Sequence, residues 1–184
     1  MGRVIAGMVM SLDGFVADRD GSLALLYPDF EALAESDAVQ DAIQTTGAVV
    51  MGRRSYDMSN GDFTGYELQA PIFVLTHSEP AEPALGQNDR LSVTFITSTI
   101  EETIALAKQA AGELDVTVVG GPETIRQCLA AGLIDELHMD IRAVLLGDGL
   151  PMFGQTGRPP VELEIVELTQ SPGYTHLRYR IVRS

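Results

Sequence analysis

The chain has 184 residues, of which 45% are hydrophobic and 21% charged, and this composition is typical of a folded globular protein with a sizeable core. The formal net charge of -14 argues against nucleic acid as a partner, because phosphates would be repelled and no basic stripe compensates. No run approaches the ~18 consecutive apolar residues of a membrane span, and the first residues lack the pattern of a secretory signal. Cys128 is the only cysteine, which excludes an internal disulfide, and we expect a cytoplasmic protein.

Apolar runs alternate with amphipathic stretches along the first two thirds of the chain, which predicts an α/β domain. Buried strands are predicted at residues 4–10, 47–52, 72–76, 93–96 and 116–119. Residues 29–44 predict a helix with Phe30, Leu33 and Ala34 among its apolar positions, and its periodicity falters near Ser36.

Two further helices are predicted from their start signals. Ser98 and Glu101 have the spacing of a capping box, and Gly112 is a natural stop for the helix that follows. Pro122 suits the first position of the other helix, because its missing N–H costs nothing there.

The last third of the chain changes character. Its predicted strands, which alternate more and are separated by Gly- and Pro-rich turns, cover residues 136–146, 161–168 and 175–183. Such alternation predicts antiparallel strands that close the edge of an otherwise parallel sheet. Because no linker, repeat or low-complexity tract is visible, we expect one domain over residues 1–184.

The turn at residues 52–55 joins a predicted strand to a helix whose first N–H groups are unpaired. Those donors and the helix dipole attract anions. Arg53 or Arg54 would add a charge-assisted phosphate contact, and the Ser55 hydroxyl a further one. The alternative is a helix start with solvated arginines, which the turn alone favours.

A second turn of this kind covers residues 120–124. Gly120 and Gly121 allow the backbone to approach a ligand closely, and a pyrophosphate would rest on the helix that begins with Glu123 and Thr124. The alternative is a tight turn with a good helix start. Neither turn matches the dinucleotide fingerprint or the P-loop, so a standard Rossmann enzyme is not predicted.

Five short segments, taken in order, resemble the dihydrofolate-reductase-like superfamily, and most of all the C-terminal reductase domain of the bacterial riboflavin-biosynthesis bifunctional deaminase-reductase. The segments are residues 10–14 (MSLDG), 49–56 (VVMGRRSY), 74–76 (VLT), 118–123 (VVGGPE) and 146–153 (LGDGLPMF). The resemblance implies a three-layer fold with a mostly parallel eight-stranded sheet, antiparallel C-terminal strands and flanking helices. It also implies NADPH as the cofactor and a reductase as the activity.

The resemblance also assigns residues to the cofactor. It places Gly52, Arg53 and Ser55 against phosphates, Leu75, Thr76 and His77 beside the adenosine part, and Gly120, Gly121, Glu123 and Thr124 beside nicotinamide and pyrophosphate. The two glycines of the family are often joined by a cis peptide. The preference for NADPH over NADH rests on Arg53, Arg54 and His77 being available to a 2′-phosphate.

Asp13 is the predicted catalytic residue. It occupies the acid position of the family's Ser-Leu-Asp-Gly segment, where a carboxyl group, or a water that it holds, would supply the proton that follows hydride transfer. The alternative is a local turn role before Gly14, which Asp favours by itself. Asp29 is a second candidate, because folate-reducing relatives carry their acid on the first helix, although a helix-start role suits it better.

Two departures from the family pattern bear on the substrate. Gly7 stands where riboflavin-pathway reductases carry a lysine, and the chain has none of the tryptophan typical of folate sites. We therefore predict an NADPH-dependent reductase of a small pterin-like or pyrimidine-like heterocycle. The alternatives are 5-amino-6-(5-phosphoribosylamino)uracil reductase, with a cation from Arg142 or Arg158, and a non-catalytic nucleotide-binding or sensor protein.

The remaining expectations concern metals and assembly. No cluster of His, Cys and carboxylates has the spacing of a metal site, and His138 and His176 are predicted to be core or surface residues. Relatives of this kind are usually homodimers, and the resemblance places the C-terminal strands or residues 147–153 near the interface.

Overall fold

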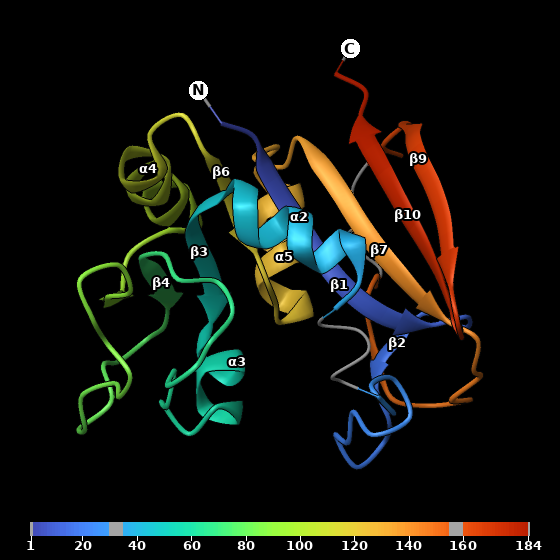
Figure 1. The fold of residues 1–184 in the computed structure, drawn as a ribbon, viewed down its shortest axis with the longest axis horizontal. Helices are drawn as coiled ribbons and strands as arrows, with labels where there is room; N and C mark the ends of the chain where they lie inside the picture. The colour runs from blue at the N-terminus through green and yellow to red at the C-terminus, as the bar shows by residue number, and fades with distance from the viewer. Residues whose placement is uncertain (1, 30–34, 155–159, 184) are drawn as a thin grey trace.

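A computed structural model describes residues 2–29, 35–154 and 160–183. Eight strands form one sheet in the order β5-β4-β3-β6-β1-β7-β10-β9 (Figure 1). They are β1 (Val4–Ser11), β3 (Thr46–Gly52), β4 (Ile72–Leu75), β5 (Val93–Ile96), β6 (Asp115–Val118), β7 (Glu136–Arg142), β9 (Leu163–Ser171) and β10 (Tyr174–Ile181). A separate small sheet pairs β2 (Phe15–Ala17) with β8 (Leu150–Pro151).

The strand directions confirm the predicted fold class. The first six strands of the sheet order, β5 through β7, pair in parallel, whereas β10 is antiparallel to both β7 and β9. The central parallel strands β3 and β6 are almost fully buried because they are covered on both faces. The edge strand β9 is exposed along nearly its whole length.

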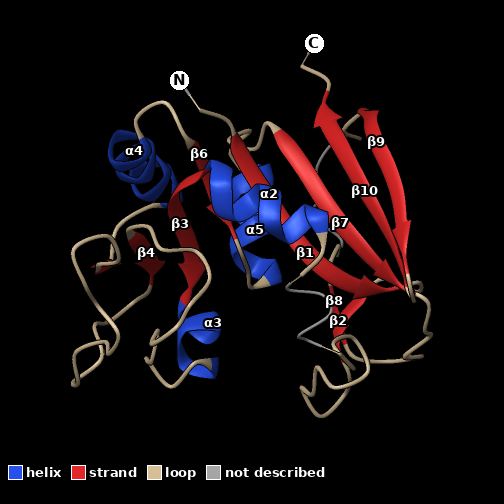
Figure 2. Ribbon diagram, in the orientation of Figure 1, coloured by secondary structure: helices blue, strands red, loops and turns tan. Residues whose placement is uncertain are grey.

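Helices cover both faces of the sheet and make three layers (Figure 2). They are α2 (Asp37–Thr45), α3 (Arg53–Met58), α4 (Ile100–Ala111) and α5 (Pro122–Ala130). The α4 and α5 helices bury Ile104 and Ile125 against the face that carries Val50. On the opposite face, Ile43 of α2 packs with Val49 and neighbouring side chains.

Two helix predictions need correction or restriction. The cap of α4 is Thr99, whose hydroxyl oxygen accepts the Glu102 N–H at 3.3 Å, so the Ser98–Glu101 box is wrong by one position. The shift buries Ile100 and Ile104 against the sheet. Of the helix predicted from Asp29, residues 30–34 lie outside the described residues, and the described helix begins after Ser36.

Within the described parts of the chain, no helix is long and apolar enough to cross a membrane.

Candidate functional site

The two glycine-bearing turns lie side by side at the carboxyl end of the central strands. The Gly52 N–H donates to the Gly120 carbonyl at 2.9 Å, which fastens the end of β3 to the end of β6. The peptide bond between Gly120 and Gly121 is cis. The helices α3 and α5, which follow β3 and β6, therefore begin side by side at the carboxyl ends of these strands. Ligands bind at this end of the strands in open α/β sheets.

Close packing explains why glycine stands at the end of β3. A Cβ atom on Gly52 would lie 2.4 Å from the hydroxyl oxygen of Thr124, which is buried in the first turn of α5. Gly120 has a φ of +125°, a conformation that residues with side chains rarely adopt. The start of α5 thus lies directly against the strand ends.

The residues at the helix starts leave backbone donors free. The N-cap residues of α3 and α5 are Gly52 and Gly121, and neither makes a side-chain capping bond. The first N–H groups of an α-helix have no partner within the helix, and an anion can take the place of the missing cap. Behind Pro122, the N–H groups of Glu123 and Thr124 begin α5.

A cavity of about 710 Å³ opens at this edge of the sheet. Its walls bring together residues of β1, β2, α3, the loop after β2 and the start of α5, and these include Met8, Val16, Ala17, Leu23, Tyr27, Met51, Arg54, Ser55, Asp62, Phe63, Tyr66, Val119, Gly121 and Pro122. Among the described residues, neither the Arg54 guanidinium nor the Ser55 hydroxyl makes a hydrogen bond or ion pair. Both groups are therefore available to a ligand.

Arg53 lies apart from this cavity. Its Nε donates to the Asp57 carboxylate at 2.8 Å, and its Nη1 donates to the Ser78 carbonyl at 2.8 Å. These contacts bring the guanidinium to the end of β4, beside Thr76 and the exposed His77. The turn alone does not distinguish the two arginines, and the resemblance places Arg53 against phosphates. In the structure Arg54 lines the cavity, whereas Arg53 lies at the end of β4.

The other predicted cofactor residues lie near the two turns, in different settings. Leu75 ends β4, and the Thr76 hydroxyl after it donates to the Ser78 carbonyl at 2.8 Å. Thr124 is buried, whereas the Glu123 carboxylate forms an ion pair with Arg126 at 2.9 Å.

The Asp13 carboxylate lies outside the cavity walls and holds a loop. It accepts hydrogen bonds from the Ser11 hydroxyl and from the backbone N–H groups of Leu146, at 3.1 Å, and Gly147, at 2.7 Å. The Ser11 hydrogen bond, and then the N–H of Gly147, lower the pKa of Asp13 from its ordinary value. These contacts fit the turn role, and its role in proton transfer stays a prediction. Asp29 is exposed and lines neither this cavity nor its neighbour.

A second cavity, of about 270 Å³, adjoins the first and is lined by titratable groups. They include His138 and His176, which the sequence predicted to be core or surface residues, and Asp140, which the sequence did not single out. The two cavities share Met8, Tyr27, Tyr66 and Val119. On the second cavity's sheet wall lie His138 and Asp140 of β7 and His176 and Arg178 of β10, and Gly7 lies beside them. The pairing of Gly7 with His138, and of His138 with Arg178, sets these side chains in rows across the strands.

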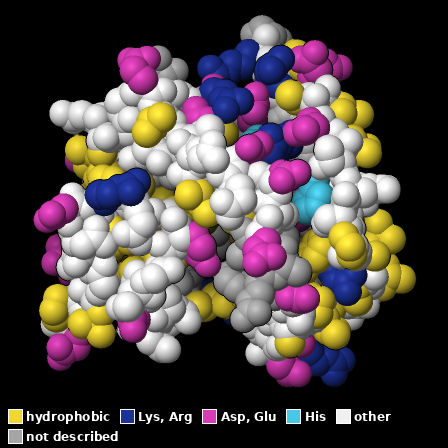
Figure 3. Space-filling model, in the orientation of Figure 1, with side chains coloured by type: hydrophobic (Ala, Val, Ile, Leu, Met, Phe, Trp, Pro, Cys, Tyr) yellow, Lys and Arg dark blue, Asp and Glu magenta, His cyan; other side chains and the backbone are white. Residues whose placement is uncertain are grey.

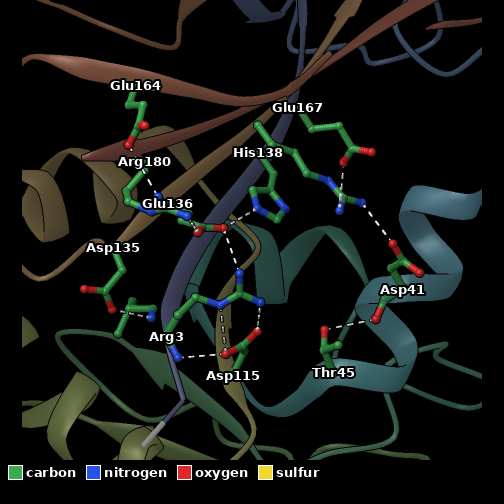
Figure 4. Close-up of polar contacts among 12 residues, drawn as sticks. Arg3, Asp41, Thr45, Asp115, Asp135, Glu136, His138, Glu164, Glu167 and Arg180 are labelled. Carbon is green, nitrogen blue, oxygen red and sulfur yellow. Dashed lines mark hydrogen bonds and ion pairs between the residues drawn. The ribbon is translucent and has the colours of Figure 1, made fainter. Parts of the chain in front are cut away.

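One of these groups also belongs to an ion-pair network that extends away from the cavity (Figure 4). His138 contacts the buried Glu136 carboxylate at 3.2 Å, and Arg3 donates to the same carboxylate at 3.0 Å and to Asp115 at 2.7 Å. Burial of the imidazole, opposed by its hydrogen bond to Glu136, lowers the pKa of His138.

A Ser–His–Asp row crosses the three C-terminal strands at the second cavity. His176 contacts the Asp140 carboxylate through Nδ1 and the Ser171 hydroxyl through Nε2, each at 2.7 Å. The His176 side chain is 7% exposed and that of Asp140 is 24% exposed. Burial raises the pKa of Tyr27, at the junction of the cavities, to about 12, so its phenol is neutral at physiological pH.

Comparison with known proteins identifies the relatives of this architecture. The family model of the RibD C-terminal domain matches residues 3–177. The uncharacterized protein YwjB of Bacillus subtilis (strain 168) is 29% identical over 152 residues, which cover 82% of each chain.

Two solved structures extend the comparison. A protein assigned to riboflavin biosynthesis from Shewanella sp. PV-4 is 25% identical, with a TM-score of 0.81 over 98% of this chain and 99% of the other. Dihydrofolate reductase from Enterococcus faecalis, complexed with NADP(H), has a TM-score of 0.65 at 16% identity, and the match covers 98% of this chain and 96% of that one. The chain therefore has the dihydrofolate-reductase-like fold that the sequence predicts.

Proposed function

Since the chain belongs to the RibD C-terminal domain family, we propose that it is an NADPH-dependent reductase that transfers a hydride to a small pterin-like or pyrimidine-like heterocycle. The observation that carries this proposal is the first cavity, in which an unpaired arginine, a free hydroxyl and an uncapped helix start surround an apolar chamber. Phosphates and an aromatic ring require these two kinds of surroundings.

The donors of this cavity fit a dinucleotide phosphate group. The N–H groups at the start of α5 and the Ser55 hydroxyl would bind the pyrophosphate, and Arg54 would neutralise its charge. A charged donor is needed because the whole chain carries a net charge of -14 and would otherwise repel a polyanion. Gly120 and Gly121 carry no side chain beside Ser55, so the ligand can approach the backbone.

Selectivity for NADPH follows from Arg53. Its guanidinium is held at the end of β4, next to Thr76 and His77, where the family resemblance puts the adenosine part of the cofactor. A 2′-phosphate there would meet a fixed cation, whereas the 2′-hydroxyl of NADH would gain little from it.

When bound, the cofactor supplies the hydride, and the protein supplies orientation and a dry site. Met8, Val16 and Val119 give the chamber apolar walls, against which a nicotinamide ring would pack next to the substrate. The second cavity opens from the same place and would receive the heterocycle.

Titration of the purified protein with NADPH and NADH, followed by fluorescence or heat, tests the proposal. We expect NADPH to bind with a micromolar dissociation constant and NADH to bind more weakly. The Arg54→Ala variant should weaken both cofactors, whereas Arg53→Ala should weaken NADPH alone. If neither cofactor binds, the protein is not a nicotinamide-dependent reductase.

The two alternative functions are the reduction of a ribose-phosphate pyrimidine and nucleotide sensing without catalysis. A ribose-phosphate substrate needs a cation, but Gly7 supplies none, and Arg142 is turned to the Gly173 carbonyl and the Tyr174 ring, outside both cavities. Arg178 lines the second cavity, but it is paired with the carboxylates of Asp41 and Glu167. Arg158 lies outside the described residues. A nucleotide sensor would bind NADPH but show no turnover with any pterin or pyrimidine offered.

We also propose that the protein is a homodimer. The edge strand β9 exposes Leu163, Ile165, Val166 and Leu168, each by more than 40%, and in Figure 3 hydrophobic side chains gather along this edge of the molecule. An apolar, unpaired edge strand invites pairing with another chain, and a second copy is the partner that the family resemblance favours. The cytoplasmic location stays a prediction from the sequence.

A further inference from the structure

The second cavity holds acid–base groups at a place where the proposed reduction needs a proton. It meets the first cavity at Met8, Tyr27, Tyr66 and Val119, and Val119 directly precedes the cis Gly120–Gly121 peptide. A ring bound in the second cavity would therefore lie next to a nicotinamide in the first. Asp13 contacts neither space, because its carboxylate is occupied by Ser11 and the loop after β7.

The Ser171–His176–Asp140 row runs from this cavity to β9, the edge strand of the sheet. Asp140 and His176 line the cavity, whereas Ser171 lies half-buried at the hairpin between β9 and β10. Both ring nitrogens of His176 are used, one by each neighbour at 2.7 Å. Asp140 Oδ1 faces His176, and among the described residues Oδ2 has no hydrogen-bond partner.

From this geometry we propose that Asp140 is the group that contacts and protonates the heterocycle, and that His176 and Ser171 resupply its proton. The inference rests on the proposed reductase function. The hydride of NADPH adds to the carbon of a C=N bond, which breaks the π bond, and NADPH becomes NADP⁺. Asp140 gives its proton to the nitrogen, and His176 replaces that proton through Nδ1 while Nε2 takes one from solvent through the Ser171 hydroxyl.

Charged and titratable side chains surround the row. Among the described residues, the charged and titratable groups that face it are His138 and Arg142 of β7, Tyr174 and Arg178 of β10, Glu167 of β9, Asp41 of α2, and Tyr27 and Glu67 of the loops. Arg178 is neutralised by Asp41 at 3.3 Å and Glu167 at 3.1 Å. Burial raises the pKa of Tyr27 to about 12, so its phenol is neutral at physiological pH.

A binding experiment without cofactor tests the assignment. The probe is pterin, and the readout is its fluorescence together with the ring resonances of His176 in the full chain. We expect pterin to shift these resonances and NADPH alone to leave them unchanged. The Asp140→Asn variant should weaken pterin binding about tenfold or more, because the contact between the Asp140 carboxyl group and the ring is lost, while NADPH affinity stays the same. Asp89→Asn, with the same charge change at an exposed position outside both cavities, should bind pterin as the wild type does.

Turnover of dihydropterin with NADPH separates proton supply from binding. Asp140→Asn should lower kcat about a hundredfold. Ser171→Ala should keep pterin affinity, lower kcat and alter its pH profile, an effect that a purely structural serine would not have. Wild-type pterin affinity in Asp140→Asn, or His176 resonances that pterin does not move, would overturn the inference. Absence of NADPH binding or turnover in the wild type counts against the proposed reductase, and the pterin measurements still decide the role of the row.

Discussion

At the scale of single residues, the site depends on how closely α5 approaches the strand ends. Gly52 has φ and ψ of -83° and 161°, which any residue adopts, so its backbone does not require glycine. Its lack of a side chain matters because the buried Thr124 hydroxyl occupies the space that a Cβ would fill, at 2.4 Å. The same close contact between Gly52 and Thr124 therefore shapes the turn proposed to bind phosphate and packs the start of α5 onto the sheet.

Replacing Gly52 with Ala should destabilise the protein by about 1–3 kcal/mol, the usual cost of an extra methyl in a packed site. It should also weaken NADPH binding, since the start of α5 must move. Removing the obstructing hydroxyl in Gly52→Ala/Thr124→Ala should recover most of the stability lost. Urea denaturation of the two single variants and the double variant forms a complete cycle. Additive losses would mean that the two side chains do not collide.

Asp13 gives a second prediction at this scale. Because its carboxylate accepts the N–H groups of Leu146 and Gly147, Asp13→Asn should speed hydrogen exchange at these two amides. The pKa of Asp13 is lowered by folding, so its contribution to stability is present above its ordinary value of 3.8 and is lost as pH falls through the lower folded value. Asp148→Asn is the matched control, because that carboxylate accepts only the N–H of Gly149 among the described residues. Equal exchange in both variants would contradict the loop-holding role.

At the scale of elements, the sequence predicts what local pattern controls and misses what strand register controls. The buried strands β3 and β6 are evident as short apolar runs, and the glycine turns follow from them. The acid–base row is not evident, because Asp140 and His176 are 36 positions apart and become neighbours only through the pairing of β7 with β10. Polar residues on half-buried strands are also common at surfaces, so their spacing alone carried no signal.

The edge strand β9 provides a prediction about assembly. If a second copy covers it, Ile165→Lys, at a position that is 63% exposed, should place a charge in an apolar interface and give monomers. Light scattering coupled to gel filtration measures the change, and the wild type should have the mass of a dimer. Leu12→Lys is a suitable control, because Leu12 is equally exposed, at 68%, but lies after β1. A monomeric wild type would refute the homodimer.

At the scale of the whole molecule, the two ends of the parallel strands have different roles. The carboxyl ends of β3 and β6 carry the two glycine turns at the first cavity, whereas the amino ends of β1, β6 and β7 are joined by the network of Arg3, Asp115 and Glu136 (Figure 4). Buried carboxylates are costly unless paired, and here Arg3 satisfies both of them. His138 contacts this network and also lines the second cavity, so it links the stability of the sheet to the site.

This link makes stability depend on pH in a defined direction. Burial keeps the pKa of His138 below its ordinary value of 6.5, so the folded protein binds a proton there less readily than the unfolded chain does. The free energy of unfolding should therefore decrease as the pH falls from 6.5 through the lower pKa that His138 has in the folded protein. This loss is absent above pH 6.5. His138→Gln should remove this part of the pH dependence, as measured by urea denaturation at a series of pH values, while His77→Gln, at an exposed position, should retain it. An unchanged profile in His138→Gln would assign the dependence to the carboxylates instead.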